Sequence, residues 1–377
     1  MIVIFNATTL VKGGALQVAV SFIRQSLSEG VGVHWYYFLS KEVSKELTDH
    51  EMERLRPHAT IFPISPARSK KSRNELLRIS GEIGANAVFT LFGPAYVRFA
   101  NTHICGVADG WVTHSTRLAF SSLESMRDQL RMLAMIIYKA FWYRKADAWI
   151  VEANNAKQGL QRRWKVPAEA VFVVPNTCSQ IYRHRSVSRV RPAKGEKLKL
   201  LSLTAYYRSK NLEIIPKVAY FMERLGCQFE FEFVITLPED DVGFKGIMSL
   251  AKQLRVEGRI RNVGLVKVDA APELYEECHI AFVPSLLETF SANYPEAMAM
   301  GLPIVASDLD FARDACADAA MYYDPINAES AAKVILELMD NPEKWECLID
   351  RGAKVLESLP TPAERFRRYV DIIRNYI

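Results

Sequence analysis

Apolar residues along the chain follow two spacings that alternate. Short runs rich in Val, Ile, Phe and Tyr have the character of buried strands. Between them lie longer stretches with an apolar residue every three or four positions, as in residues 16–27, which is typical of an amphipathic helix. This alternation predicts a parallel sheet wrapped by helices. In the first half the strand-like runs are Ile2–Phe5, Val33–Phe38, Thr60–Ile64, Ala87–Phe92, His103–Val107, Ala148–Val151 and Val171–Val174.

The alternation pauses once and then resumes. Residues 181–197 are polar, basic and poor in aliphatic side chains, which indicates a linker. We therefore expect an α/β domain over residues 1–180 and a second one over 198–360. The final segment, 361–377, repeats apolar residues at helical spacing and is predicted to be a helix. Strand-like runs after the linker are Leu198–Leu203, Phe229–Ile235, Ile280–Pro284, Pro303–Ser307 and Met321–Tyr323.

Charge divides the chain unevenly. Residues 1–191 hold 26 Lys and Arg against 14 Asp and Glu, a net charge of +12, whereas the remainder holds 22 against 29, a net charge of −7. A basic half favours an anionic partner. We expect an anionic membrane surface or a phosphate-bearing acceptor, and no nucleic acid, because no nucleic-acid module signature is visible.

The sequence does not indicate a metal site, secretion or a membrane span. Its six cysteines are scattered, with no CxxC pair and no His at ligand spacing. The first ten residues lack the regions of a signal peptide. The apolar stretch 130–150 is interrupted by Arg131, Lys139, Arg144 and Lys145, too many charges for a spanning helix. We expect a cytoplasmic protein.

Two segments of the basic half combine basic and apolar residues. They are Arg68–Arg73 and Leu130–Lys145, and together they suggest peripheral contact with the inner face of an anionic membrane. A solvated charge cluster beside an ordinary core helix explains the same pattern, so both interpretations stay open.

The segment 284–307 carries the strongest chemical signal. A buried strand ends at Pro284, a loop with Glu288 follows, and a short helix is expected to begin at Pro295 and end at Gly301 before the next strand. Ligands of open α/β sheets bind outside the carboxyl ends of the strands, and the free amides of a helix start attract phosphate.

This arrangement suits a nucleotide diphosphate sugar. The amides near Ser291, Ala292 and Asn293 are candidates for the diphosphate. Glu296 is a candidate acceptor for two ribose hydroxyls, and Glu288 for a hexose hydroxyl. Each carboxylate also has an ordinary explanation: Glu296 compensates a helix dipole, and Glu288 is a solvated loop residue.

The same segment matches a known signature. Residues Glu288–Val305 follow the pattern E-x7-E and then E-A-M-A-x-G-x-P-V/I-V, so the chain resembles the retaining family-4 glycosyltransferases of the GT-B type. Weaker similarities to strands and turns of that family lie at Gly13–Gly14, Asp147–Val151, Val174–Thr177, Arg208–Asn211 and Tyr322–Pro325.

The resemblance implies a fold and a set of roles. The fold is two Rossmann-like doubly wound parallel-sheet domains facing a central cleft, with the last helix crossing back to the N-terminal domain. Glu288, Asp109 and Lys210 are the implied catalytic residues. Donor-binding residues are then Gly13, Gly14, Arg208, Lys210, Glu288, Phe290, Ser291, Ala292, Asn293 and Glu296, with no metal ligand and no cofactor beside the donor itself.

Two departures from the family pattern shape this assignment. Many members carry His-Asp after the strand that here is His103–Val107, where this chain has Ala108 and Asp109. Asp109 is therefore the first-domain candidate, with His114 the weaker one. The family often has Gly-Arg five residues before the Lys, but that position is Ala205, so Arg208 is expected to supply the second positive charge.

The expected function is transfer of a hexose-type sugar from a nucleotide diphosphate to a saccharide or lipid-linked acceptor with retention, in the synthesis of surface polysaccharide or lipopolysaccharide. Three alternatives remain. They are a non-catalytic nucleotide-sugar-binding partner, a nucleotide-sugar epimerase on the same fold, and a metal-dependent transferase that uses the D-x-D pair Asp308 and Asp310.

Overall fold

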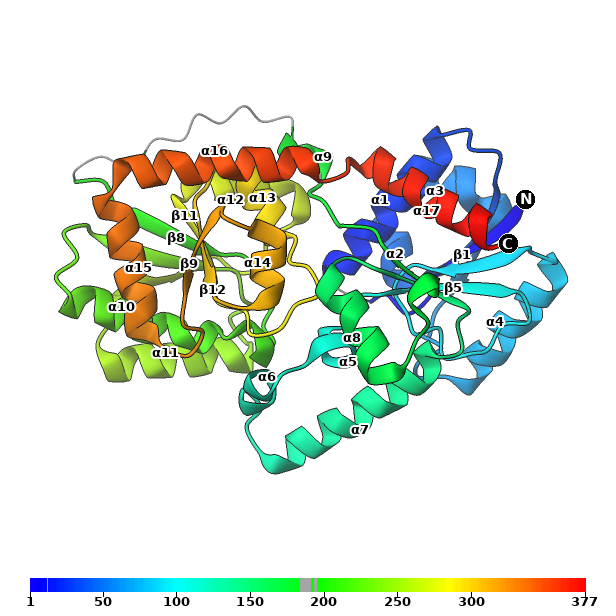
Figure 1. Cartoon of the computed structure of the whole chain (residues 1–377), viewed down its shortest axis with the longest axis horizontal. Helices are drawn as coiled ribbons and strands as arrows, with labels where there is room; N and C mark the ends of the chain where they lie inside the picture. The colour runs from blue at the N-terminus through cyan, green and yellow to red at the C-terminus, as the bar shows by residue number, and fades with distance from the viewer. Residues whose placement is uncertain (12, 184–190, 193–194) are drawn as a thin grey trace. The chain divides into compact units, whose positions relative to one another are not determined.

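The chain divides into two α/β units in a computed structural model that describes residues 1–11, 13–183, 191–192 and 195–377 (Figure 1). The first unit contains Met1–Ser115, Ser125–Asn176 and Pro360–Ile377, and the second contains Thr116–Glu124 and Thr177–Leu359. The division falls at Asn176 rather than at residue 180, and the short segment 116–124 groups with the second unit. Part of the expected linker, residues 184–190 and 193–194, lies outside the described residues.

A seven-stranded parallel sheet forms the centre of the first unit. Its strand order is β3-β2-β1-β4-β5-β6-β7. The chain adds β2 and β3 on one side of β1 and β4 to β7 on the other, so the direction of winding reverses between β1 and β4. All seven runs predicted from the sequence are strands. Their bounds are β1 Ile2–Ala7, β2 His34–Ser40, β3 Ala59–Phe62, β4 Ala87–Thr90, β5 Thr102–Val107, β6 Ala148–Val151 and β7 Val171–Val173.

Helices cover both faces of this sheet because successive strand residues point to opposite sides. Val3 and Phe5 of β1 belong to the core beneath α1 and α17, whereas Ile4 belongs to the core beneath α4. The helices of the first unit are α1 Gly14–Ser28, α2 Lys41–Lys45, α3 Asp49–Leu55, α4 Lys70–Ile83, α5 Gly110–His114, α7 Met126–Tyr143, α8 Asn154–Trp164 and α17 Pro362–Tyr376, with 3₁₀ turns at Arg56–His58 and Ala168–Ala170.

The C-terminal helix α17 is part of the first unit. It runs beside α1, although more than three hundred residues separate the two in the sequence (Figure 1). Its apolar stripe packs aromatic rings into the core: the centroids of Phe366 and Phe22 lie 5.0 Å apart, and those of Phe366 and Trp35 lie 6.2 Å apart. The stripe read from the sequence is therefore buried on the first unit.

The second unit is built on a six-stranded parallel sheet. Its order is β10-β9-β8-β11-β12-β13, and the winding reverses between β8 and β11. Five strands were predicted, and the three-residue edge strand β10 was missed. The bounds are β8 Leu198–Ser202, β9 Phe231–Ile235, β10 Ile260–Asn262, β11 Ile280–Val283, β12 Ile304–Ser307 and β13 Ala320–Tyr323.

Two hydrophobic layers enclose this second sheet. Phe233 and Phe282 lie in the layer that includes α10 and α15, and Val234 and Val283 lie in the layer that includes α12 and α13. The helices of the second unit are α6 Arg117–Ser121, α9 Gln180–Arg183, α10 Ile215–Arg224, α11 Val242–Leu254, α12 Ala271–Glu277, α13 Asn293–Ala299, α14 Asp310–Cys316, α15 Ala328–Asp340 and α16 Pro342–Ser358, with 3₁₀ turns at Arg208–Lys210, Leu212–Ile214, Glu257–Arg259 and Val268–Ala270.

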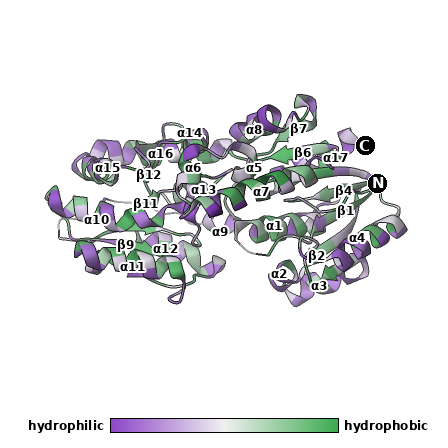
Figure 2. Ribbon diagram, turned by 90° about the horizontal axis from the view of Figure 1, so that it is seen from below, coloured by the Kyte–Doolittle hydropathy of each residue, from purple (hydrophilic) through white to green (hydrophobic). Residues whose placement is uncertain are grey.

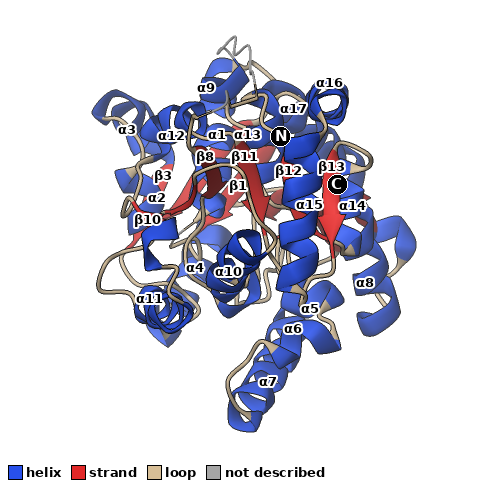
Figure 3. Cartoon of the chain, turned by 90° about the vertical axis from the view of Figure 1, so that its left-hand side faces the viewer, coloured by secondary structure: helices blue, strands red, loops and turns tan. Residues whose placement is uncertain are grey.

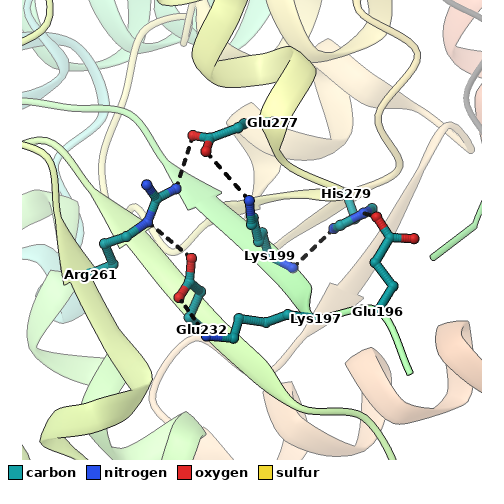
Figure 4. A network of polar contacts seen from close by, with 7 residues as sticks. All are labelled: Glu196, Lys197, Lys199, Glu232, Arg261, Glu277 and His279. Atoms are coloured by element: carbon teal, nitrogen blue, oxygen red, sulfur yellow. Dashed lines mark hydrogen bonds and ion pairs between the residues drawn. The ribbon is translucent and has the colours of Figure 1, made fainter. Parts of the chain in front are cut away.

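A charged network ties the strand starts of the second sheet together (Figure 4). The Glu232 carboxylate on β9 lies 2.9 Å from Arg261 on β10 and 3.4 Å from Lys197 beside β8. Arg261 also pairs with Glu277 at 3.0 Å and, by donating to its carboxylate, lowers the pKa of that group. The network joins the side of the sheet opposite the carboxyl strand ends, where the ligands of such folds bind.

Replacement of Phe366 by Ala should destabilise the first unit by about 3–5 kcal/mol, because a ring that is only 1% exposed leaves a cavity between α17, α1 and the sheet. Urea unfolding of the full chain measures the loss. Arg368→Ala, an exposed position on the same helix, is the matched control. Equal unfolding midpoints for the two variants would contradict the packing of α17.

Candidate functional site

The reversal of winding in the second sheet places two loops side by side. Strands β8 and β11 pair directly, with Leu201 opposite Ala281. The loop after β8 carries Lys210 and the loop after β11 carries Glu288. The segments that follow two such adjacent strands lead toward opposite sides of the sheet. They leave a crevice at the carboxyl ends of the strands, which is the usual ligand position in this architecture.

Lys210 and Glu288 form an ion pair across these two loops. The Lys210 ammonium donates to the Glu288 Oε1 atom, and the Ser285 hydroxyl donates to the same oxygen over 2.9 Å. The two side chains are only 17% and 14% exposed. The backbone holds the pair in register, because the Leu286 amide donates to the Ser209 carbonyl over 2.7 Å.

The turn after Lys210 is fixed by Asn211. This residue has a φ of +54°, a left-handed conformation that Asn tolerates better than most residues. Its side-chain amide donates to the Pro325 carbonyl over 3.2 Å, so the turn is tied to the loop after β13. The Lys-Asn dipeptide noted in the sequence thus supplies a charge and the bend that presents it.

Helix α13 follows Glu288 and begins earlier than expected. It starts at Asn293, so Pro295 occupies the third helical position rather than the first. Proline fits there because the first four amides of a helix have no partner within it. Gly301 ends the helix with a φ of +66°, which glycine adopts without strain.

The start of α13 is anchored by its first residue. The Asn293 side chain donates to the Leu203 carbonyl over 2.7 Å, which ties the helix to the end of β8. Among the described residues, the amides of Ser291, Ala292 and Asn293 donate no backbone hydrogen bond. Phe290, just before them, is half-buried against the core of this unit.

Glu296 meets two tyrosines that the sequence did not single out. Tyr275 on α12 donates to Glu296 Oε2 over 3.0 Å, and Tyr182 on α9 also hydrogen-bonds to this carboxylate. Burial raises the pKa of Glu296 to about 7, and the two hydroxyls act in the opposite direction by stabilising the ionised form. Since Tyr182 and Tyr275 come from distant segments, no local pattern indicated them.

Arg208 lies in the same 3₁₀ turn as Lys210 but has partners of its own. Its guanidinium lies 2.7 Å from Glu213 and also pairs with Glu124. The Tyr206 hydroxyl donates to the same Glu213 carboxylate. Arg208 therefore reaches a ligand only by exchanging these contacts, just as Lys210 does only by leaving Glu288.

The first sheet has a polar cavity at its own reversal of winding. A cavity of about 340 Å³ lies at the ends of β1, β4 and β5 and is lined by residues that include Thr9, Gly93, Tyr96, Asp109 and Lys139. Ala15, the second residue of α1, also lines it. A bound molecule there would meet mixed polar and aromatic walls.

Asp109 is both a helix cap and half of an ion pair. Its carboxylate accepts from the Val112 amide over 3.3 Å and from the Lys139 ammonium over 2.7 Å. Burial lowers the pKa of Lys139, but the charge and the hydrogen bond of Asp109, together with Tyr96, outweigh this and raise it above the usual value. His114 lies at the end of the same short helix, with its Nδ1 atom 2.7 Å from the Thr113 hydroxyl.

Gly13 and Gly14 open α1. Gly13 has a φ of +75°, which strains any residue with a side chain, and among the described residues no side chain caps the helix start. The first amides of α1 are thus left to other partners. Gly13, Gly14 and Asp109 belong to the first unit, and Lys210, Glu288 and Glu296 to the second.

The described residues contain no group of three or more His, Cys, Asp or Glu side chains that could hold a metal ion. Asp308 of the D-x-D pair faces Arg313, which donates to its two oxygens over 2.5 and 2.8 Å. Hydrogen bonding by Arg313 lowers the pKa of Asp308. This carboxylate is therefore matched to a guanidinium within its own helix–loop segment.

Comparison with known proteins assigns the second unit. Residues 187–355 match the family model described as glycosyl transferases group 1. The chain carries a group 1 glycosyltransferase domain. This domain spans both loops of the Lys210–Glu288 pair and the whole of α13.

Curated relatives of this glycosyltransferase extend beyond that domain. The O-antigen chain mannosyltransferase B of Escherichia coli is 23% identical over 235 residues, which is 60% of each chain. The alpha-D-kanosaminyltransferase of Streptomyces kanamyceticus is 21% identical over 344 residues, or 83% of this chain and 86% of the relative. The chain is thus a glycosyltransferase enzyme, as the sequence predicted.

Solved structures share the whole fold. The Anabaena protein Alr3699/HepE in complex with UDP-glucose superposes with a TM-score of 0.72 over 100% of both chains, at 14% identity. This similarity and the two parallel sheets establish the predicted GT-B class of fold. Across the described residues, none of the helices has the length and apolar content needed to cross a bilayer.

The raised pKa of Glu296 makes a testable statement about stability. Between pH 4.5, the ordinary value for Glu, and about 7, the folded glycosyltransferase holds a proton on Glu296 that the unfolded chain has released. The contribution of Glu296 to stability should therefore fall as the pH rises through this range.

Urea unfolding at pH 5 and pH 7.5 tests this for the wild type and for Glu296→Gln, which cannot titrate. The wild type should lose stability relative to the variant as the pH rises. A constant difference between the two proteins would show that Glu296 titrates normally.

Proposed function

We propose that this glycosyltransferase moves a hexose-type sugar from a nucleotide diphosphate to a saccharide or lipid-linked acceptor with retention of anomeric configuration. The observation that carries the proposal is the Lys210–Glu288 pair at the reversal of winding in the second sheet. The resemblance of Glu288–Val305 to the retaining family-4 signature supports it.

A sugar diphosphate offers each member of the pair a better-matched partner. Lys210 would turn to the diphosphate, and the Glu288 carboxylate would accept from hydroxyls of the sugar. After the exchange both charges still have partners, so the two loops keep the same positions with and without donor. Departure of the nucleotide builds negative charge on the β-phosphate, which a fixed ammonium stabilises.

The rest of the donor has candidate contacts nearby in the same unit. The amides of Ser291, Ala292 and Asn293 suit a phosphate, since helix starts attract anions. Glu296 would accept from the two ribose hydroxyls, with Tyr275 and Tyr182 keeping its carboxylate oriented. Gly13 and Gly14, which belong to the first unit, remain donor-binding candidates from the sequence resemblance alone.

Retention without a protein nucleophile follows from attack on the face that the nucleotide leaves. The bond between the anomeric carbon and the β-phosphate oxygen breaks, and the acceptor oxygen bonds to the same carbon. The acceptor proton passes to the departing phosphate. In this scheme Lys210 and the amides stabilise charge and Glu288 positions the sugar, while Asp109 is the first-unit candidate for contact with the acceptor.

The acceptor is proposed to bind the first unit. Its cavity holds the Asp109–Lys139 pair and aromatic walls, and the basic half of the chain favours a phosphate-bearing molecule. The E. coli relative is named as an O-antigen chain mannosyltransferase. We therefore propose a lipid-linked saccharide acceptor in surface polysaccharide synthesis, used at the cytoplasmic face of a membrane.

Donor screening tests the class of reaction. Thermal shift against UDP-, GDP-, ADP- and CMP-sugars, each with magnesium or with EDTA, should give one stabilising nucleotide family and no dependence on the metal. Product analysis then separates the alternatives. An epimer formed without acceptor indicates an epimerase, and binding without transfer over an acceptor panel indicates a non-catalytic partner.

Lys210→Ala and Glu288→Gln should each lower kcat/KM by about 100-fold or more, since each removes a contact to the reacting donor. The assay is sugar transfer from the donor found in the screen. Lys217→Ala and Glu239→Gln, exposed positions of the same unit, are the charge-matched controls. Near-wild-type turnover in either site variant would refute the role given to that residue.

A further inference from the structure

Helix α7 presents an apolar stripe to solvent. Met126, Leu130, Leu133, Ile137 and Phe141 are 71%, 63%, 46%, 56% and 53% exposed. Their spacing of three and four residues puts them on one face of the helix. The colouring of Figure 2 shows hydrophobic residues along α7, and in Figure 3 the helix lies at the lower edge of the view.

The stripe is not the core-facing side of α7. Ile136, Ala140 and Tyr143 form that side and are buried. The helix is therefore apolar on two faces, one packed on the first unit and one exposed. An ordinary surface helix exposes charged and polar residues on its outer face, so the stripe indicates an interaction surface.

Positive charge surrounds the stripe. Between Ser125 and Lys145 the chain has five cations and one acid, Asp128, and one of the cations, Lys139, is already paired with Asp109. Arg127, Arg131 and Arg144 are exposed, and Lys145 lies 4.5 Å from the centre of the Phe141 ring. The acid is already occupied, because Ser125 donates to it over 2.6 Å and Arg131 lies 3.6 Å away.

A second basic segment adjoins α7. Arg73, in the first turn of α4, lies 3.4 Å from the Tyr138 hydroxyl and 5.7 Å from the centre of the Trp142 ring. Arg68, Lys70 and Lys71, within five residues of Arg73, are exposed. The two basic segments noted in the sequence are thus neighbours in the first unit.

We propose that this face of α7 docks on an anionic lipid bilayer, with the apolar stripe in the headgroup–acyl boundary and the surrounding Arg and Lys on lipid phosphates. An amphipathic helix with cations beside its apolar face binds membranes in this way without crossing them. The inference rests on the proposed lipid-linked acceptor, because docking on the bilayer would bring that acceptor within reach of the first unit.

Charge complementarity selects the bilayer over a second copy of the chain. A symmetric dimer through α7 would set the same patch against itself, and the cations of both copies would face one another. An anionic surface instead neutralises them. Attraction of this kind is screened by salt, which gives the proposal a direct signature.

Vesicle flotation of the full chain tests the proposal. The protein should float with phosphatidylcholine vesicles that contain phosphatidylglycerol and not with phosphatidylcholine alone, and high salt should weaken the binding. The double variant Leu130→Glu/Ile137→Glu should bind at least tenfold more weakly. Arg127→Gln/Arg131→Gln should lose roughly tenfold, because each cation near an anionic surface contributes to affinity.

Leu265→Glu is the control, since Leu265 is a 75% exposed apolar residue of the second unit. It should float like the wild type. No flotation of the wild type at low salt, or equal losses in Leu265→Glu and Leu130→Glu/Ile137→Glu, would overturn the proposal. Light scattering that shows a wild-type dimer, dissociated by the α7 variant, would overturn it in favour of a second copy.

Thermal shift with UDP-glucose and the other donors runs in parallel on the same proteins. Donor stabilisation should be the same in the wild type and the α7 variants, which also shows that they fold. Vesicle binding without any donor binding would remove the proposed function and leave the α7 surface standing. Donor binding without vesicle binding would do the reverse.

Discussion

The contact between the Lys210 ammonium and the Glu288 carboxylate is the constraint on which the candidate site depends. It joins loops that leave β8 and β11, two strands distant in sequence but paired in the sheet. A half-buried ion pair persists only where the backbone keeps both partners in place. Here the Leu286–Ser209 hydrogen bond and the left-handed turn at Asn211 do so. The geometry thus prepares two opposite charges at the position where the winding of the sheet reverses.

Charged residues lie at both ends of the strands in the second sheet, but their arrangement differs. At the strand starts, Glu232, Arg261 and Glu277 pair with one another and with neighbouring lysines (Figure 4). At the strand ends, charges are set on loops and on the first turn of α13. The first unit also has charged residues at the carboxyl ends of its strands, because its cavity with Asp109 and Lys139 lies at a reversal of winding. Each sheet therefore offers a ligand position of its own, one rich in groups suited to a sugar nucleotide and one lined by aromatic and charged walls.

The sequence pattern predicted the features that depend on residues close together in the chain. Strands of Val, Ile and Phe were identified because burial between two helix layers demands continuous apolar runs. Strand β10, Ile-Arg-Asn, was missed because at the sheet edge it has one buried residue and two polar ones. The E-x7-E segment was recognised because its strand, loop and helix are contiguous. Tyr182, Tyr275 and Lys139 were not, since each meets its carboxylate only through the tertiary fold. The exposure of the α7 stripe was equally hidden, as a helical repeat does not say which of two apolar faces is covered.

A crystal structure of the chain with the stabilising nucleotide sugar bound tests the central claim most directly. The account predicts that the Lys210–Glu288 contact opens, with the ammonium within hydrogen-bonding distance of the β-phosphate and the carboxylate on the sugar hydroxyls. A donor bound elsewhere, with the ion pair intact as it is here, would contradict it.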